Sequence, residues 1–151
     1  MLRVLGCTRD RLGMAIDAGI RETVAVLNLL GLPTTQSCEG HVNDHGHGLP
    51  APWVDFDLAD PDVPIRAQML LQMFYASDSL VDDDVRLTLD RGRLSNGGGF
   101  AALDATRAAL GQGELTPDQV RELHARLAAR QAEMRRFASF LKDRLDLSEA
   151  A

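Results

Sequence analysis

The sequence is poor in cysteine and in aromatic residues. Its 151 residues include two cysteines, Cys7 and Cys38, and aromatic residues make up 5% of the chain. Two cysteines do not provide the disulfide framework on which small secreted domains depend. Because aromatic residues are so few, the core must be built mainly from Leu, Val, Ile, Ala and Met.

Long apolar runs and an excess of positive charge are also missing. The longest apolar stretch, residues 23–32, is interrupted by Asn28 and is far shorter than the roughly 20 residues of a membrane span. The first 11 residues carry four charges instead of the apolar segment of a signal peptide. The formal net charge of −6 argues against nucleic-acid binding, which needs a basic patch, although five arginines between residues 121 and 136 leave a local patch open. We therefore expect a cytoplasmic protein that binds neither membranes nor nucleic acids.

The hydrophobic pattern predicts two helices in the first half of the chain. Apolar residues recur at spacings of three and four from Ile16 to Leu30, and Gly31 is placed to end this helix as a left-handed C-cap. Residues 60–77 form the second predicted helix, with Pro64 in its first turn. Its expected apolar face contains Ile65, Met69, Leu70, Met73 and Phe74. A third, short helix is expected over residues 100–110.

Between the helices, three or four short segments alternate as strands do. Residues 34–38 read as a strand, and residues 52–58 alternate with Val54, Phe56 and Leu58 on the inner face. After an acidic segment over 81–85 that we expect to be a solvated turn, residues 86–90 alternate again and lead through a turn into a strand near 93–95. The pattern predicts an α+β fold, with a small three- to four-stranded sheet covered by helices.

The last helix has the clearest boundary signals. Thr116 suits the N-cap, Pro117 the first helical position and Gln119 the third position of a capping box. Apolar residues then recur in a near-heptad pattern to Leu145, with Arg130 at one seam position. About 30 helical residues would span about 45 Å, more than the width of a domain this small. We expect an α+β domain over residues 1–112 and a helix over 113–151 that also packs on a second copy as a homodimer. Alternatively, half of the helix covers the sheet and the other half frays.

The segment TTQSCEGHVNDHGHG, residues 34–48, concentrates metal-binding residue types. It holds Cys38, His41, His45 and His47, and so three of the four histidines of the chain. Zinc prefers four tetrahedral ligands drawn from thiolate, imidazole and carboxylate, and the glycines of this loop give it freedom to wrap around an ion. These residues predict a site for zinc or another divalent transition metal. Carboxylates further along the chain could support it as ligands or as imidazole acceptors: Asp55 and Asp57.

Two other interpretations of this loop stay open. Cys38 could be a nucleophile whose pKa is lowered by His41, with Glu39 or Asp55 orienting the imidazole. The loop could also be polar without binding a metal or reacting. If the chain is an enzyme, we expect metal-assisted hydrolysis with one coordination position left to water. If it is not, we expect a dimeric binding module whose functional surface is the long helix.

A longer pattern extends over roughly the first 60 residues and resembles a set of small bacterial and phage proteins. The matching positions are Gly19, Ile20, Val24, Leu27, Asn28, Thr34, Ser37, Cys38, Gly40, His41, Pro52, Trp53, Val54 and Phe56. A more distant resemblance, carried by Thr35, Ser37, Cys38 and Gly40, is to the strand-loop of the wybutosine-synthesis tRNA methyltransferase family. In this chain Glu39 replaces a serine of that family, and His41 stands at the position of a basic residue.

These resemblances imply a pocket lined by Ser37, Cys38, Gly40 and His41, and they add nucleotide or RNA modification as a third hypothesis for function. Together with the acidic residues nearby, they predict a small-molecule pocket at the strand ends. Its expected members are Ser37, Cys38, Glu39, Gly40, Asp55 and Asp57. Neither resemblance implies a particular reaction.

Overall fold

The computed structural model describes residues 9–42, 50–76, 80–97 and 115–150, apart from the side chains of the last four of these residues. It contains a four-stranded antiparallel sheet in the order β1-β2-β4-β3. The predicted α+β fold is therefore confirmed, whereas the helix expected over 100–110 lies outside the described residues. In chain order the elements are η1 (Ala18–Ile20), α1 (Arg21–Leu29), β1 (Thr34–Cys38), β2 (Trp53–Phe56), α2 (Asp62–Tyr75), β3 (Leu87–Asp90), β4 (Arg93–Asn96) and α4 (Pro117–Ala150).

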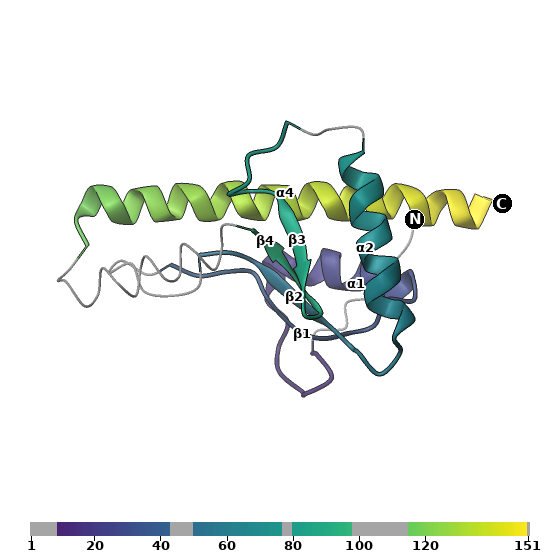
Figure 1. Ribbon diagram of the computed structural model, residues 1–151. Coiled ribbons are helices and arrows are strands. Elements are labelled where there is room, and N and C mark those ends of the chain that lie inside the picture. Colours follow the sequence, from purple (N-terminus) through teal and green to yellow (C-terminus); the bar gives the residue numbers. More distant parts are fainter. Residues whose placement is uncertain (1–8, 43–49, 77–79, 98–114, 151) are drawn as a thin grey trace.

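One hydrophobic core joins the sheet to the three α-helices. Alternate strand residues turn one face of the sheet toward this core, because successive side chains of a strand point to opposite sides. Figure 1 shows the long helix α4 with α2 crossing it and α1 lying below it, and both helices also contact the strands. The strands contribute Val54, Phe56, Leu87 and Leu94 to the core, and the helices contribute Val24 and Leu27, Leu71 and Phe74, and Met134, Phe137 and Leu141.

The end of α1 follows the sequence signals closely. Gly31 has a φ of +75°, and its N–H donates to the Asn28 carbonyl at 3.1 Å. The N–H of Leu32 donates to the Leu27 carbonyl at 2.9 Å. This pair of bonds is a Schellman motif, which favours glycine at the left-handed position. The predicted C-cap is therefore confirmed, and it directs the chain into β1.

The apolar face predicted for α2 is correct only in part: Phe74 is buried, and Leu70 packs partly buried against the core. Ile65, Met69 and Met73 are 57%, 55% and 42% exposed, and the buried residues are Val63, Ala67, Leu71, Phe74 and Tyr75. Both stripes have helical spacing, so periodicity alone could not separate them. The buried stripe is selected by Tyr75, whose hydroxyl accepts from the Leu87 N–H at 2.8 Å and donates to Glu133 at 3.2 Å.

The inner face predicted for residues 52–58 is correct only as far as the strand extends. Val54 and Phe56 are buried, but Leu58 is 53% exposed. β2 ends at Phe56; the Asp57 N–H still donates to the Pro33 carbonyl at 2.8 Å, but proline has no N–H to return the bond, so the pairing stops there. Leu58 therefore lies in the turn toward α2, where strand alternation no longer applies.

The capping box of α4 is confirmed. The Thr116 N–H donates to Gln119 Oε1 at 2.8 Å, and the Gln119 N–H donates to Thr116 Oγ1 at 3.2 Å. The helix has 34 residues, which correspond to about 51 Å. None of the helices in the described part of the chain is both long and apolar enough to cross a membrane.

The apolar seam of α4 packs within its own chain. Five seam residues are buried there: Leu127, Met134, Phe137, Leu141 and Leu145. Because these residues already cover the chain's own core, a homodimer through α4 would have to use other side chains, such as the half-buried Val120 and Leu123. The homodimer stays a prediction.

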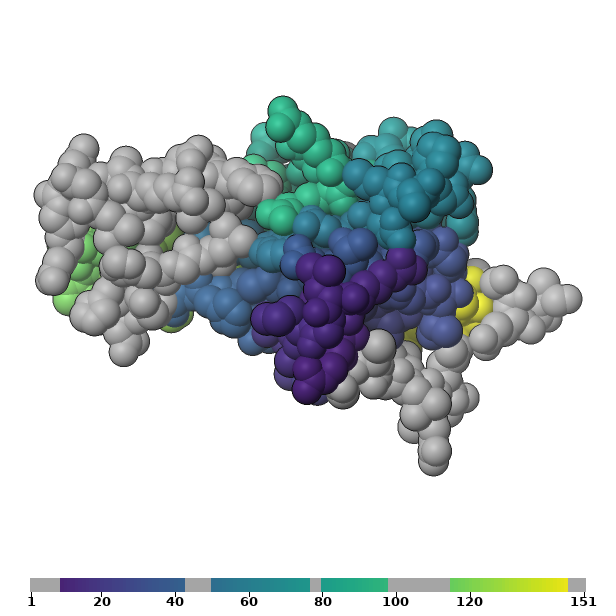
Figure 2. All heavy atoms as spheres, turned by 90° about the horizontal axis from the view of Figure 1, so that it is seen from below, coloured from purple at the N-terminus to yellow at the C-terminus, as the bar shows by residue number. Residues whose placement is uncertain are grey.

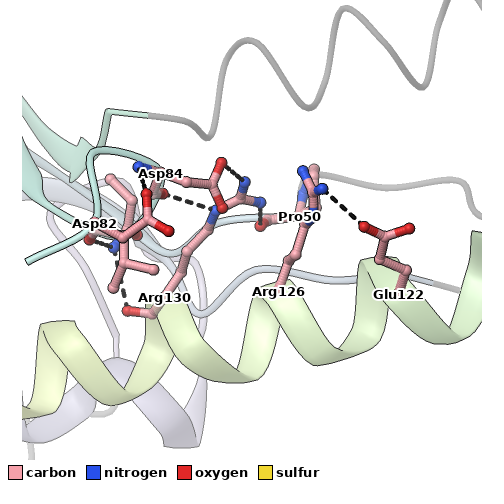
Figure 3. Close-up of polar contacts among 8 residues, drawn as sticks. Pro50, Asp82, Asp84, Glu122, Arg126 and Arg130 are labelled. Carbon is pink, nitrogen blue, oxygen red and sulfur yellow. Dashed lines mark hydrogen bonds and ion pairs between the residues drawn. The ribbon is translucent and has the colours of Figure 1, made fainter.

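Arg130 places a buried positive charge in the seam of α4. Its side chain has no exposed surface, and its Nη2 donates to Asp84 Oδ1 at 2.6 Å. The guanidinium also donates to the Asp84 carbonyl at 3.2 Å and to the Pro50 carbonyl at 2.7 Å (Figure 3). The acidic segment over 81–85, expected to be solvated, thus contributes Asp84 as the partner of a buried cation.

Replacing Asp84 by alanine should lower the free energy of unfolding by about 2–3 kcal/mol, because the buried Arg130 guanidinium loses its counter-charge. The loss stays at this level because the Asp84 end of the pair is partly exposed to solvent. Urea unfolding of Asp84→Ala beside Asp83→Ala measures this, since Asp83 is an exposed neighbour and the ion pair of Arg130 is with Asp84. Equal unfolding midpoints for the two variants would contradict the assignment.

Candidate functional site

Three side chains of metal-ligating type meet where β1 ends. Asp17 precedes η1, Cys38 is the last residue of β1, and His41 follows three residues later. One ligand atom from each lies within 4.8 Å of the others. His41 Nε2 is 3.3 Å from Asp17 Oδ2. The view in Figure 2 shows the purple N-terminal residues lying against the blue atoms of the segment that contains Cys38.

Backbone hydrogen bonds hold the two segments of this cluster together. The Glu39 N–H donates to Asp17 Oδ2 at 3.0 Å, and in return Glu39 Oε2 accepts from the Gly19 N–H at 2.7 Å. A Cβ on Gly19 would come within 2.3 Å of that carboxylate oxygen, so any other residue here would displace the Glu39 carboxylate. The segment before α1 and the turn after β1 therefore form one unit.

A tight turn at Gly40 points Cys38 and His41 to the same place. Gly40 has a φ of +86°, and its N–H donates to Cys38 Sγ at 3.3 Å. A Cβ on Gly40 would lie 2.6 Å from Leu127 Cδ1 and 2.9 Å from the Ala51 carbonyl carbon. Both the left-handed backbone and the lack of space therefore explain a glycine here.

The surroundings of Cys38 disfavour a free thiolate. Partial burial raises the pKa of the Cys38 thiol, the negative charges of Asp17 and Glu39 raise it further, and the Gly40 N–H opposes them. A thiol that keeps its proton is a weak nucleophile. These surroundings therefore do not favour the hypothesis that His41 activates Cys38 as a nucleophile. An anionic environment is instead suited to a bound cation, whose charge would reverse these effects.

The predicted supporting carboxylates have other partners. Asp55 accepts two hydrogen bonds from Arg93, at 2.6 and 2.8 Å. Asp57 pairs with Arg11, and its Oδ1 accepts from the Ala59 N–H at 2.9 Å. Within the described residues, neither aspartate joins the group around Cys38. Their expected role beside the metal is therefore not seen in this arrangement.

Of the remaining predicted site residues, Ser37 lies on the opposite side of the sheet. It pairs with Val54, which is fully buried, whereas Cys38 pairs with Trp53. Because neighbouring strand residues point to opposite faces, Ser37 and Cys38 cannot line one pocket on the same face. Glu39 and Gly40 do belong to the site, as the turn described above. The predicted ligands His45 and His47 lie outside the described residues.

The sheet face that carries Cys38 continues into a polar surface with a hollow. The Arg93 guanidinium lies 4.0 Å from the centre of the Trp53 ring, and its hydrogen bond to Asp55 raises the pKa of Arg93. Beyond this pair, the hollow has a volume of about 440 Å³ and is lined by Thr35, Asp55, Leu58, Asp90, Arg91 and Arg93, among others. The hollow lies toward the start of β1, because its lining residue Thr35 precedes Cys38 by three strand residues, about 10 Å along the strand.

Asp17 is the functional candidate that the sequence analysis missed. It lies far from the Cys/His-rich segment in sequence, and only the tertiary fold brings it to Cys38. Asp17 stands at the N-cap of η1 without a side-chain capping bond, which only the structure shows. Its carboxylate is turned instead toward Glu39 and His41.

Gly40→Ala should lower the free energy of unfolding by about 3 kcal/mol or more, because two costs add. Alanine disfavours the left-handed backbone, and its Cβ would collide with Leu127 and Ala51. Gly13→Ala is the matched control: Gly13 has a φ of +79°, but nothing lies within 4 Å of its added Cβ. That variant should lose only about 1 kcal/mol. Similar losses in urea unfolding would show that space at Gly40 is not limiting.

The family resemblance remains a prediction. Several residues that carry it lie together in the cluster. Gly19 contacts Glu39, Gly40 shapes the turn, and Cys38 and His41 provide ligand atoms. Comparison with known proteins adds no family: no protein-family model, curated protein or solved structure matches the chain.

Proposed function

We propose that Asp17, Cys38 and His41 bind a divalent transition metal of the zinc class, and that the protein uses it in metal-assisted hydrolysis of a small molecule. The observation that carries the proposal is the proximity of the three ligand atoms, all within 4.8 Å of one another. Ligand atoms around tetrahedral zinc are separated by about 3.5 Å, given metal–ligand distances of 2.0–2.3 Å. Small side-chain rotations would close that difference.

The donor set and its charge support zinc over calcium or magnesium. Thiolate, imidazole and carboxylate are all ligand types that zinc binds, whereas calcium and magnesium prefer oxygen ligands throughout. Deprotonated Cys38 and Asp17 would supply two negative charges and so balance a divalent ion. The N–H that Gly40 donates to Cys38 Sγ would stabilise the thiolate in the bound state.

Three protein ligands are the usual number in a catalytic zinc site, where the fourth position holds water. A metal in such a site lowers the pKa of its bound water to about 7 and so provides hydroxide at neutral pH. Here the cluster opens toward solvent, because the His41 side chain is 59% exposed. The hollow near Thr35 lies about 10 Å further along β1, so a substrate bound there would have to extend along the strand to reach the metal.

The metal proposal is tested by elemental analysis and zinc titration of protein purified without chelator or added metal. We expect about one ion per chain in the wild type, and about 100-fold weaker binding in Asp17→Ala, Cys38→Ser and His41→Ala, since each removes one ligand. His124→Ala is the matched control, because His124 is exposed on α4 and lies outside the cluster. Its affinity should equal that of the wild type.

Two outcomes of this experiment would change the conclusion. No zinc bound by the wild type would end the metal proposal. Zinc binding that is unaffected in Asp17→Ala but lost in His45→Ala or His47→Ala would move the ion away from the cluster. In that case the ligands predicted from the sequence would form a closed, structural site, and a non-catalytic binding module would become the better function.

A further inference from the structure

A glutamine on α4 contacts the turn that shapes the cluster. Gln131 Nε2 donates to the Glu39 carbonyl at 2.8 Å, although the two residues are 92 positions apart. That carbonyl and the Gly40 N–H belong to the same peptide group. The Gly40 N–H in turn donates to Cys38 Sγ at 3.3 Å. One peptide group therefore connects Gln131 on one side to the Cys38 sulfur on the other.

Two neighbours of Gln131 pack against the same loop. Leu127 lies one helical turn earlier and fills the space beside Gly40 and Ala51. Arg130 donates to the Pro50 carbonyl at 2.7 Å, at the far end of the segment that follows Gly40 (Figure 3). Residues at spacings of three and four share a helix face. This face of α4 thus holds the chain just after β1 and again just before β2.

The geometry of the cluster depends on the peptide that Gln131 holds. The His41 side chain is 59% exposed, and its polar contact in the described part of the chain is with Asp17. Side-chain packing therefore constrains His41 weakly, and its direction follows from the backbone at Glu39 and Gly40. A donor on the Glu39 carbonyl also polarises the peptide group, which strengthens the bond from its N–H to the sulfur.

We propose that Gln131 is a positioning residue of the metal site: it fixes the Glu39–Gly40 peptide and thereby the placement of Cys38 and His41 around the ion. This inference rests on the proposed metal-binding function, but its effect on the peptide itself can be measured without any metal. Partners outside the first ligand shell typically change metal affinity by 10- to 100-fold, and we expect about tenfold here.

The test replaces Gln131 by methionine, which has similar length and helix propensity but no N–H donor. In the metal-free full chain, the Gly40 amide proton should exchange faster in Gln131→Met than in the wild type. Zinc should bind about tenfold more weakly, and the sulfur-to-metal band of the cobalt(II) derivative should shift. Gln131→Lys, which restores a donor, should recover much of the affinity. Gln72→Met, on the exposed side of α2, is the control and should match the wild type.

The outcomes separate this inference from the proposed function. Unchanged Gly40 exchange in Gln131→Met would overturn the positioning role, whatever the metal result. Faster exchange with unchanged zinc affinity and an unchanged cobalt spectrum would also overturn it, because the peptide would then not govern the site. A wild-type protein that binds no zinc or cobalt would refute the proposed function, and the role of Gln131 at a metal site with it.

Discussion

The arrangement of the molecule depends on the hydrogen bonds of the Arg130 guanidinium. It has no exposed surface, and its donors reach the Asp84 side chain, the Asp84 carbonyl and the Pro50 carbonyl. The Arg130 carbonyl also accepts from Asn96 Nδ2 at 3.3 Å, which ties α4 to β4. A buried charge must satisfy its donors to be tolerated, so these bonds fix how α4 lies across the sheet and the loop.

The candidate site follows from that placement. With α4 held against the chain near Pro50, Leu127 packs beside Gly40 and leaves room only for glycine there. The turn at Gly40 then brings Cys38 and His41 to Asp17, which the bond from the Glu39 N–H holds in position. The ligand cluster is therefore built from a segment before α1, the end of β1 and the support of a distant helix.

Local signals predicted much of the fold but only part of the site. The Gly31 C-cap and the capping box at Thr116 are short-range interactions, so their residues can be recognised from the sequence alone. The buried face of α2 was predicted correctly only at Phe74 and Leu70, because two apolar stripes share helical spacing and the contacts of Tyr75 with Leu87 and Glu133 decide between them. Cys38 and His41 could be found from their clustering. Asp17 could not, since its role arises from tertiary contact.

The central claim, a metal held by Asp17, Cys38 and His41, is tested most directly by X-ray absorption at the zinc edge of the zinc-loaded protein. Our account predicts a first shell with one sulfur at about 2.3 Å and nitrogen or oxygen ligands at about 2.0–2.1 Å, and the sulfur should disappear in Cys38→Ser. A shell of nitrogen and oxygen alone in the wild type would contradict the account, because Cys38 would then not be a ligand.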